Sequence, residues 1–213
     1  MGDLPVHYKP DLTKSEVQNL ESTYRKKVKE LLKLTDIKEI NKFYDEEVFP
    51  LSMARFYYEY YLNTEVVDYL YLPVGLQVNS PILSVLASPA KHIVFIASTE
   101  SKKVCREVAK ILKIKKDNYS ILSFRKEPYF DEIIETVASH FFLRKESRTT
   151  FVFDITSGKK TMSIAIASIA ITYDMPMVYI ESTNVKKMFK GINEVKTYLP
   201  SVKLLFEKLE KGE

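Results

Sequence analysis

The chain changes its hydrophobic period near residue 66. Before that point apolar residues recur at helical spacing, first over residues 15–32 and then after Asp36, a residue type that favours helix starts. Pro50 interrupts the second stripe, and residues 53–62 form a third that is dense in aromatic side chains. We expect helices here, with the rings packed inward rather than exposed for base stacking, because their spacing suits one helix face.

From residue 69, short apolar runs alternate with stretches of helical spacing. The runs, rich in Ile, Val, Phe and Tyr, are Tyr69–Val74, His92–Ala97, Tyr119–Phe124, Thr150–Ile155 and Met177–Ile180. The helical stretches are Pro81–Leu86, Lys103–Leu112, Phe130–Phe142 and Lys160–Tyr173. Continuous apolar runs are typical of strands buried on both faces. The pattern therefore predicts an α/β fold, a mainly parallel sheet flanked by helices with an N-terminal helical extension.

This pattern divides the chain into two parts. Residues 1–65 form a helical extension or arm, and residues 66–213 form the α/β domain. The segment from Ser182 to Leu199 is ambiguous and is compatible with a terminal strand or a hairpin. Residues 201–209 have the spacing of a final amphipathic helix.

Composition excludes several classes of protein. With 213 residues, of which 46% are hydrophobic, the chain can bury one sizeable core. No apolar run approaches the roughly 20 residues of a membrane span, and no signal-peptide pattern opens the chain. Cys105 is the single cysteine, so no intrachain disulfide forms and a reducing, cytoplasmic setting fits. His7, His92 and His140 lack metal-site spacing, and we expect no metal and no other cofactor.

Charge is distributed unevenly along the chain. Residues 1–65 carry 10 Lys and Arg against 12 Asp and Glu, whereas residues 66–213 carry 22 against 16. The overall charge of +4 alone does not indicate nucleic-acid binding. An anionic partner should meet the second part of the chain.

Ligands of open parallel sheets bind beyond the carboxyl ends of the strands. The loop after the first strand run contains a glycine and hydrogen-bonding side chains: Gly75, Gln77, Asn79 and Ser80. Its alternative interpretation is a plain turn in which Ser80 caps the next helix. The loop after the second run supplies Ser98, Thr99 and Glu100. Either hydroxyl can cap a helix or hold a phosphate or ribose.

The loop after the fourth run is the most informative. Asp154 at the strand end is followed by the polar and cationic residues Thr156, Ser157, Gly158, Lys159, Lys160 and Thr161. Gly158 permits a bend that turns amide N–H groups toward an anion, while the helix start and two lysines add positive charge. The alternative interpretation of this loop is that Asp154 only caps the turn and that Lys159 and Lys160 are merely solvated.

Two standard nucleotide motifs are absent from the sequence. A Walker A loop requires glycine where Phe153 stands and Ser or Thr where Lys160 stands. No G-x-G-x-x-G exists either, which disfavours ATP hydrolysis of the P-loop kind and a dinucleotide site.

The segment Asp154-Ile155-Thr156-Ser157-Gly158-Lys159-Lys160-Thr161-Met162 resembles the signature of CARF domains, the CRISPR-associated Rossmann-fold sensors. The stretches 72–75, 80–83, 93–96 and 98–100 are similar to that family's first two strands and loops. The resemblance covers about residues 69–183. It implies a Rossmann-like homodimer whose loops bind a cyclic oligoadenylate, with cyclic tetra-adenylate the first choice, in type III CRISPR signalling.

Carried over by motif position, the resemblance implies a set of ligand contacts: Gly75, Gln77, Ser80, Ser98, Thr99, Glu100, Asp154, Thr156, Ser157, Gly158, Lys159, Lys160 and Thr161. We expect Asp154 to organise the loop rather than touch a polyanion, because like charges repel. The resemblance leaves the ring size of the messenger open.

Three roles remain for such a domain. It is the sensor part of a fused or recruited effector, a standalone metal-independent ring nuclease, or, from another class, a DNA-binding transcriptional regulator. In the nuclease, Lys160 would stabilise charge and Ser98 or Thr99 would hold the ribose, giving a 2′,3′-cyclic phosphate. The acidic balance of residues 1–65 disfavours direct binding to duplex DNA.

Overall fold

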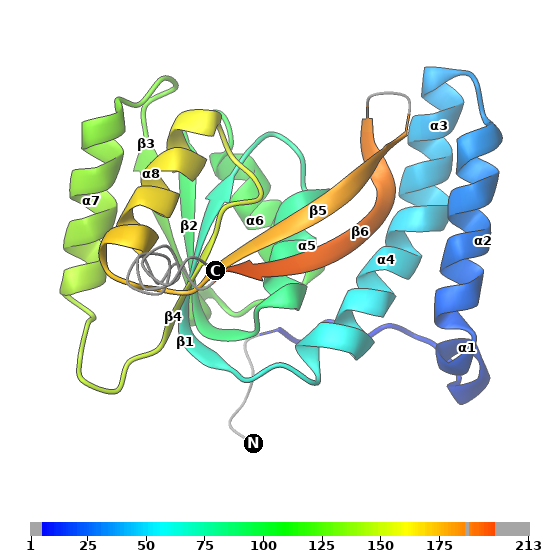
Figure 1. Ribbon diagram of the computed structural model, residues 1–213, viewed down its shortest axis with the longest axis horizontal. Helices are drawn as coiled ribbons and strands as arrows, with labels where there is room; N and C mark the ends of the chain where they lie inside the picture. The colour runs from blue at the N-terminus through cyan, green and yellow to red at the C-terminus, as the bar shows by residue number, and fades with distance from the viewer. Residues whose placement is uncertain (1–5, 186–187, 199–213) are drawn as a thin grey trace, which may run out of the picture.

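A six-stranded sheet forms the centre of the protein in the computed structural model, which describes residues 6–185 and 188–198 (Figure 1). The strands are β1 Val67–Val74, β2 Ala90–Ser98, β3 Tyr119–Phe124, β4 Phe151–Asp154, β5 Met177–Val185 and β6 Met188–Tyr198. Their order is β3-β2-β1-β4-β5-β6, and every neighbouring pair is parallel except β5 and β6. The predicted α/β fold is confirmed, and the ambiguous segment forms the antiparallel β5–β6 pair.

The central strand β1 shows why the apolar runs are continuous. Leu70 pairs with Ile93 of β2 on one side and Val152 of β4 on the other. Successive side chains of a strand point to opposite faces, so Leu70 and Leu72 enter one core and Tyr71 enters the other. All three side chains are buried, which requires an apolar residue at every position.

Helices cover both faces of the sheet (Figure 1). Helices α5 Asn79–Ala87 and α6 Lys102–Ile111 pack on the face of Leu70, and α7 Phe130–Phe142 and α8 Lys160–Thr172 pack on the face of Tyr71. A short 3-10 turn, η3 Lys116–Asn118, precedes β3. The predicted helices are confirmed, with ends that shift by one or two residues.

The N-terminal region is helical, as predicted, but its breaks differ. Its elements are α1 Lys14–Gln18, α2 Leu20–Lys33, α3 Ile37–Phe43, η1 Tyr44–Val48, α4 Phe49–Phe56 and η2 Tyr57–Tyr61. The first predicted helix is divided at Asn19. The predicted interruption at Pro50 is wrong, because the helix continues from α3 to η2. Pro50 lies in the first turn of α4, directly after the wider π-helical turn η1, where its missing N–H is tolerated.

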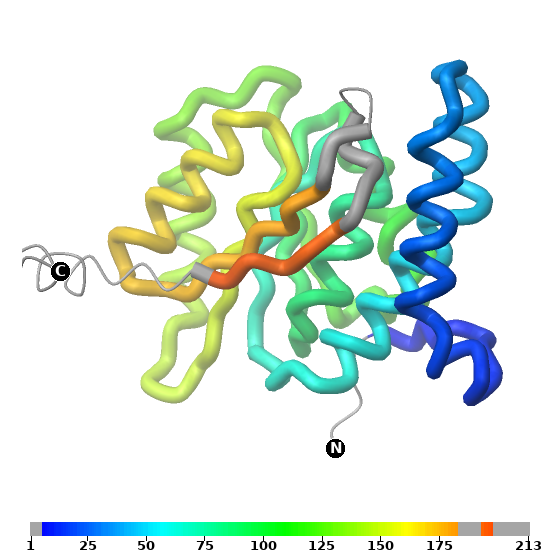
Figure 2. The backbone as a smooth tube through the Cα atoms, turned by 45° about the vertical axis from the view of Figure 1, so that its right-hand side comes forward, coloured from blue at the N-terminus to red at the C-terminus, as the bar shows by residue number. Residues whose placement is uncertain are grey.

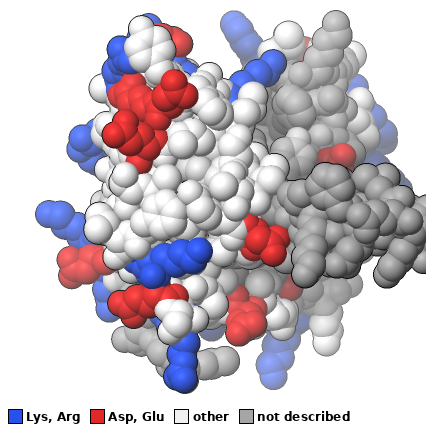
Figure 3. Space-filling view, turned by 60° about the vertical axis from the view of Figure 1, so that its left-hand side comes forward, with Lys and Arg blue, Asp and Glu red and all other residues white. Residues whose placement is uncertain are grey.

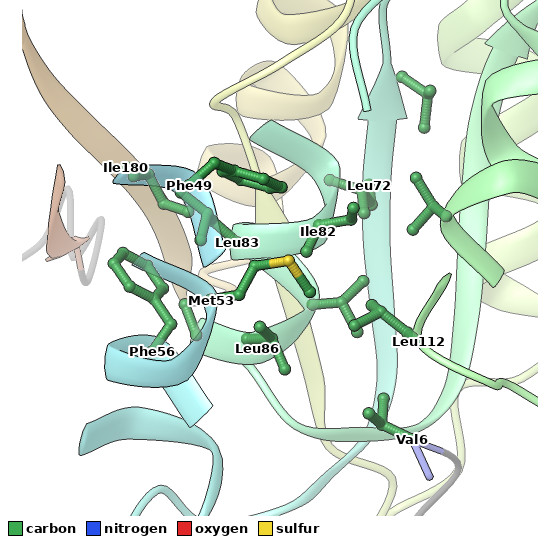
Figure 4. Close-up of a cluster of buried hydrophobic side chains, with 14 of the residues drawn as sticks. Val6, Phe49, Met53, Phe56, Leu72, Ile82, Leu83, Leu86, Leu112 and Ile180 are labelled. Carbon is green, nitrogen blue, oxygen red and sulfur yellow. The ribbon is translucent and has the colours of Figure 1, made fainter. Parts of the chain in front are cut away.

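The N-terminal helices share one hydrophobic core with the sheet. Figure 4 shows Met53 of α4 extending toward Leu83 and Leu86 of α5, and Phe49 and Phe56 of α4 belong to the same core. Helix α2 lies beside β6 in Figure 2 and contacts it. Of the aromatic stretch, Phe56 and Tyr61 are buried and the other rings pack against each other, so the expected inward packing is found. The domain boundary at residue 65 stays a prediction.

The predicted final helix at residues 201–209 lies outside the described residues. Within the part of the chain that the structure describes, no helix has the length and apolar character needed to cross a membrane.

The shared core predicts that helices and sheet unfold together. Phe56→Ala should lower the free energy of unfolding by about 3–5 kcal/mol, because Phe56 is fully buried in the core that the N-terminal helices share with α5 and the sheet. Leu62→Ala, at a half-exposed position, should cost less than about 1 kcal/mol. Urea unfolding followed by circular dichroism should show one transition for each variant. A separate early transition of the helices would contradict a common core.

Candidate functional site

A cavity of about 330 Å³ opens where the strand order of the sheet reverses. From β1 the chain moves to β2 and β3 on one side, and β4 and β5 lie on the other side. The loops after β1 and β4 therefore border the crevice in which open α/β sheets bind ligands. The lining residues come from these loops, from α5, from β5 and β6, and from η1: Tyr44, Gly75, Leu76, Gln77, Asn79, Ser80, Leu83, Thr156, Ser157, Gly158, Tyr179, Ile180, Ser182 and Asn193.

Two glycines allow the β1 and β4 loops to lie against each other. A Cβ atom on Gly75 would lie 3.5 Å from the backbone nitrogen of Gly158. Gly158 has a φ of +92°, and a Cβ there would lie 2.8 Å from Cβ of Pro73. Positive φ and close backbone approach both favour glycine, so the predicted bend at Gly158 is present.

Hydrogen bonds fix the β4 loop to its neighbours. The Asp154 carboxylate accepts the Thr156 N–H at 2.8 Å and the Thr156 hydroxyl at 2.9 Å. The same hydroxyl oxygen accepts the N–H of Ile180 on β5 at 2.8 Å. The Ser157 hydroxyl donates to the carbonyl of Pro73 at the end of β1. Three strands are thereby joined at one edge of the cavity.

Asp154 lies beneath the cavity rather than in it. Its side chain is fully buried, and burial raises the pKa of its carboxyl to about 6 against the opposing effect of its hydrogen bonds. It accepts backbone N–H bonds in the loop, the arrangement expected for a residue that organises the turn.

The structure brings six of the expected contact residues to the cavity: Gly75, Gln77, Ser80, Thr156, Ser157 and Gly158. The alternative role of Ser80 as a helix cap is wrong, because α5 begins at Asn79 with Val78 in the cap position. Asp154, Ser98, Thr99, Glu100, Lys159, Lys160 and Thr161 do not line it.

The two lysines of the motif have different surroundings. Lys159 donates to the carbonyl of Lys126 and pairs with Glu127 at 2.9 Å and Glu100 at 3.7 Å. Its pKa is raised by Glu127, and the pKa of Glu127 is lowered in turn. Lys160, at the start of α8, is exposed and forms no ion pair with the residues that the structure describes. Of the two lysines, Lys160 is the one available to bind an anionic ligand.

The β2 loop does not reach the cavity. Ser98 is buried, and its hydroxyl lies 3.3 Å from the Ser101 hydroxyl. Thr99 is exposed and donates its N–H to the carbonyl of Phe124. Neither caps α6, which begins after Ser101. The expected ribose contacts at Ser98 and Thr99 therefore lack support from the geometry of this cavity.

Several lining residues were not singled out from the sequence. In the sequence, Tyr44 is an ordinary apolar position of an amphipathic helix, and Asn79 is one polar residue of the loop after the first strand run. Tyr179, Ser182 and Asn193 lie on strands β5 and β6, whose pairing the sequence left ambiguous. No local motif marks them, because they reach the cavity only through tertiary packing.

The cavity is polar but uncharged. No Asp, Glu, Lys, Arg or His is among the described residues that line it, and no group of potential metal ligands occurs in the described ranges. Two lining side chains carry buried hydroxyls that have no hydrogen-bond partner in the described structure, Ser80 Oγ and Ser182 Oγ, and a third buried polar atom, Asn193 Nδ2, has at most the Tyr44 hydroxyl. Buried polar atoms are normally paired, so this cavity is suited to a neutral polar group.

Comparison with known proteins gives a family match. A family model described as the Card1 CARF domain matches residues 81–207, more than half of the chain. No curated protein matches the sequence.

Solved structures are similar to this chain at low sequence identity. Csm6 of Enterococcus italicus, bound to cyclic hexa-2′-fluoro-hexa-dAMP, is 12% identical with a TM-score of 0.52, over 68% of this chain and 46% of that chain. Can2 from Sulfobacillus thermosulfidooxidans, in complex with cyclic tetra-adenylate, is 13% identical with a TM-score of 0.45, over 60% of this chain and 36% of that chain. This chain therefore spans less than half the length of either protein.

The glycine contacts predict a difference between two matched substitutions. Gly158→Ala should lower the free energy of unfolding by about 1–3 kcal/mol, because it combines a positive φ with a clash against Pro73. Gly75→Ala introduces only an ordinary contact and should cost less. Urea unfolding measures both. Equal effects would show that the turn at Gly158 relaxes freely.

The buried carboxylate predicts a pH dependence of stability. The folded-state pKa of Asp154 is about 6, against an ordinary value of 3.8, so the folded state binds the proton of this carboxyl more tightly than the unfolded state does. The contribution of this proton to the free energy of unfolding is therefore full below pH 4 and is lost as the pH rises through 6. The asparagine of Asp154→Asn does not ionise. The free energy of unfolding of this variant, measured relative to that of the wild type, should therefore be about 2–3 kcal/mol higher at pH 7.5 than at pH 4. Unfolding free energies measured at both pH values test this, and a constant difference would contradict it.

Proposed function

Because the chain belongs to the Card1 CARF domain family, we propose that it binds a cyclic oligoadenylate, with cyclic tetra-adenylate as the first choice, in type III CRISPR signalling. The observation that carries the proposal is the uncharged cavity at the switch point of the sheet, lined by buried polar atoms without partners. The site thus offers hydrogen bonds in the crevice where this fold class binds ligands.

The cavity suits one nucleoside of the ring. Nucleobases and riboses are neutral and carry several donors and acceptors, which match the Ser80 and Ser182 hydroxyls and the Asn193 amide. The mixture of apolar and polar lining residues is also what a base requires, since its faces are apolar and its edge is polar.

The phosphates belong at the rim of the cavity. Gly158 lines the cavity, and two residues later α8 begins with Lys160, so amide N–H groups and a full charge lie next to the base site. Lys159 is engaged with two carboxylates and would have to exchange partners to join them.

We propose a homodimer as the complete binding unit. At about 330 Å³ the cavity lies at the small end of ligand pockets, and it holds part of a cyclic tetranucleotide rather than all of it. A second copy related by a two-fold axis supplies a second cavity for the opposite part of the ring. Helix α8 offers a surface for this contact: residues 161–173 carry no charge, and Ile164 and Ile171 are exposed. Figure 3 shows a broad uncharged area on this side.

Binding is the proposed activity, rather than cleavage. The groups expected to hold a ribose for cleavage, Ser98 and Thr99, lie outside the cavity, and its described lining includes no general acid or base of ordinary type. The chain spans less than half of Csm6, so we propose that it serves as the sensor part of a fused or recruited effector.

Lys160 provides the test of this function. In calorimetric titrations with cyclic tri-, tetra- and hexa-adenylate, the tetranucleotide should bind at one ring per two chains. Lys160→Ala should weaken that binding by about 1–3 kcal/mol, the scale of a lost charged hydrogen bond.

Lys116→Ala, at an exposed lysine before β3 on the opposite edge of the sheet, is the matched control and should leave the affinity unchanged. The absence of binding to all three rings would overturn the proposed function. Linear products in mass spectra of the mixtures would show a ring nuclease instead of a sensor.

A further inference from the structure

The lining residue Asn193 combines burial with a donor that is not fully used. It lies on β6, the residue is 3% exposed, and its Nδ2, which carries two hydrogens, finds at most one acceptor among the described residues, the Tyr44 hydroxyl. A buried amide hydrogen without a partner is costly, so its presence at a cavity wall indicates that a ligand supplies the second acceptor.

The backbone of Asn193 is held by the N-terminal helices. Its N–H donates to the hydroxyl of Tyr24 on α2 at 3.1 Å, and its carbonyl accepts from Nη1 of Arg55 on α4 at 2.9 Å. Arg55 is in turn paired through Nε with Glu21 at 2.8 Å and Glu59 at 3.0 Å. Tyr24 is fully buried.

Tyr44 completes this wall of the cavity. It is the first residue of the π-helical turn η1, and it lines the cavity beside Asn193. Burial raises the pKa of its hydroxyl, and a hydrogen bond with the Asn193 side chain opposes part of that rise. The hydroxyl therefore stays protonated at neutral pH.

From this geometry we infer that Asn193 is the specificity-determining residue that reads the base of the ligand, and that Tyr24 and Arg55 are its positioning residues. The inference rests on the proposed function. An asparagine amide pairs with adenine because Oδ1 accepts from the N6 amino group while Nδ2 donates to N7. On that edge hypoxanthine presents two acceptors, O6 and N7, so it leaves Oδ1 without a donor and cannot form both bonds.

The other polar lining groups are less suited to distinguishing adenine from hypoxanthine. The Ser80 and Ser182 hydroxyls both donate and accept, so they do not distinguish an amino from an oxo group. The Asn79 amide faces Asp45 at 3.4 Å, and Gln77 is exposed and must be ordered before it can select a base.

Part of this wall lies outside the family match. The match begins at residue 81, whereas Tyr24, Tyr44 and Arg55 precede it. The helices before β1 therefore contribute to the choice of ligand in addition to completing the core.

The experiment compares cyclic tetra-adenylate with cyclic tetra-inosinate, which share the same phosphate ring. The wild type should bind the adenylate about tenfold or more tightly. Asn193→Leu, of similar size, should lose that preference by weakening adenylate binding alone. Tyr24→Phe removes only the hydroxyl that holds the Asn193 N–H, and should reduce the preference several-fold while inosinate binding stays constant.

Asn118→Leu is the matched control, since Asn118 lies before β3 at the opposite edge of the sheet and should keep the full preference. Thermal unfolding of each variant shows that it is folded. Equal binding of both rings to the wild type, or an unchanged preference in Asn193→Leu, would overturn this inference and leave the proposed function standing. Failure of the wild type to bind either ring would overturn the proposed function and this inference with it.

Discussion

The close contact between the turns after β1 and β4 is the constraint on which the site depends. The turns approach within van der Waals distance because Gly75 and Gly158 have no side chains, and because Gly158 adopts a positive φ. Strands β1 and β4 are adjacent in the sheet, so a bulkier pair would separate the strand ends. Glycine is therefore required here by close packing as well as by backbone conformation.

This contact is supported by a carboxylate that the fold buries at a cost. Asp154 exchanges its hydration for the N–H and hydroxyl of Thr156, and that hydroxyl also holds Ile180 of β5. The buried charge thus orders the loop and joins β4 to β5. Strand β6 pairs with β5, so the position of Asn193 on β6 depends on these hydrogen bonds. On its other side, Tyr24 and Arg55 hold the Asn193 backbone through hydrogen bonds.

Sequence alone predicted the elements whose cause is local. The strands follow from continuous apolar runs, and the turn at Gly158 follows from a polar, glycine-containing segment between a strand and a helix. The sequence could not show that Lys159 pairs with Glu100 and Glu127, since those carboxylates follow β2 and β3. Tyr44 and Asn193 lie 149 positions apart and meet only after the helices pack on β6.

The separation of charge from the cavity has a physical consequence for recognition. In the proposed complex, phosphates meet Lys160 at an exposed rim, where salt screens the attraction and the contribution is independent of the base. The base meets neutral groups that are already buried, where hydrogen bonds are stronger and a mismatch leaves a polar atom unpaired. Affinity for a nucleotide ring and selection of its base are then set by different residues, and the residues that select are those which the N-terminal helices hold in place.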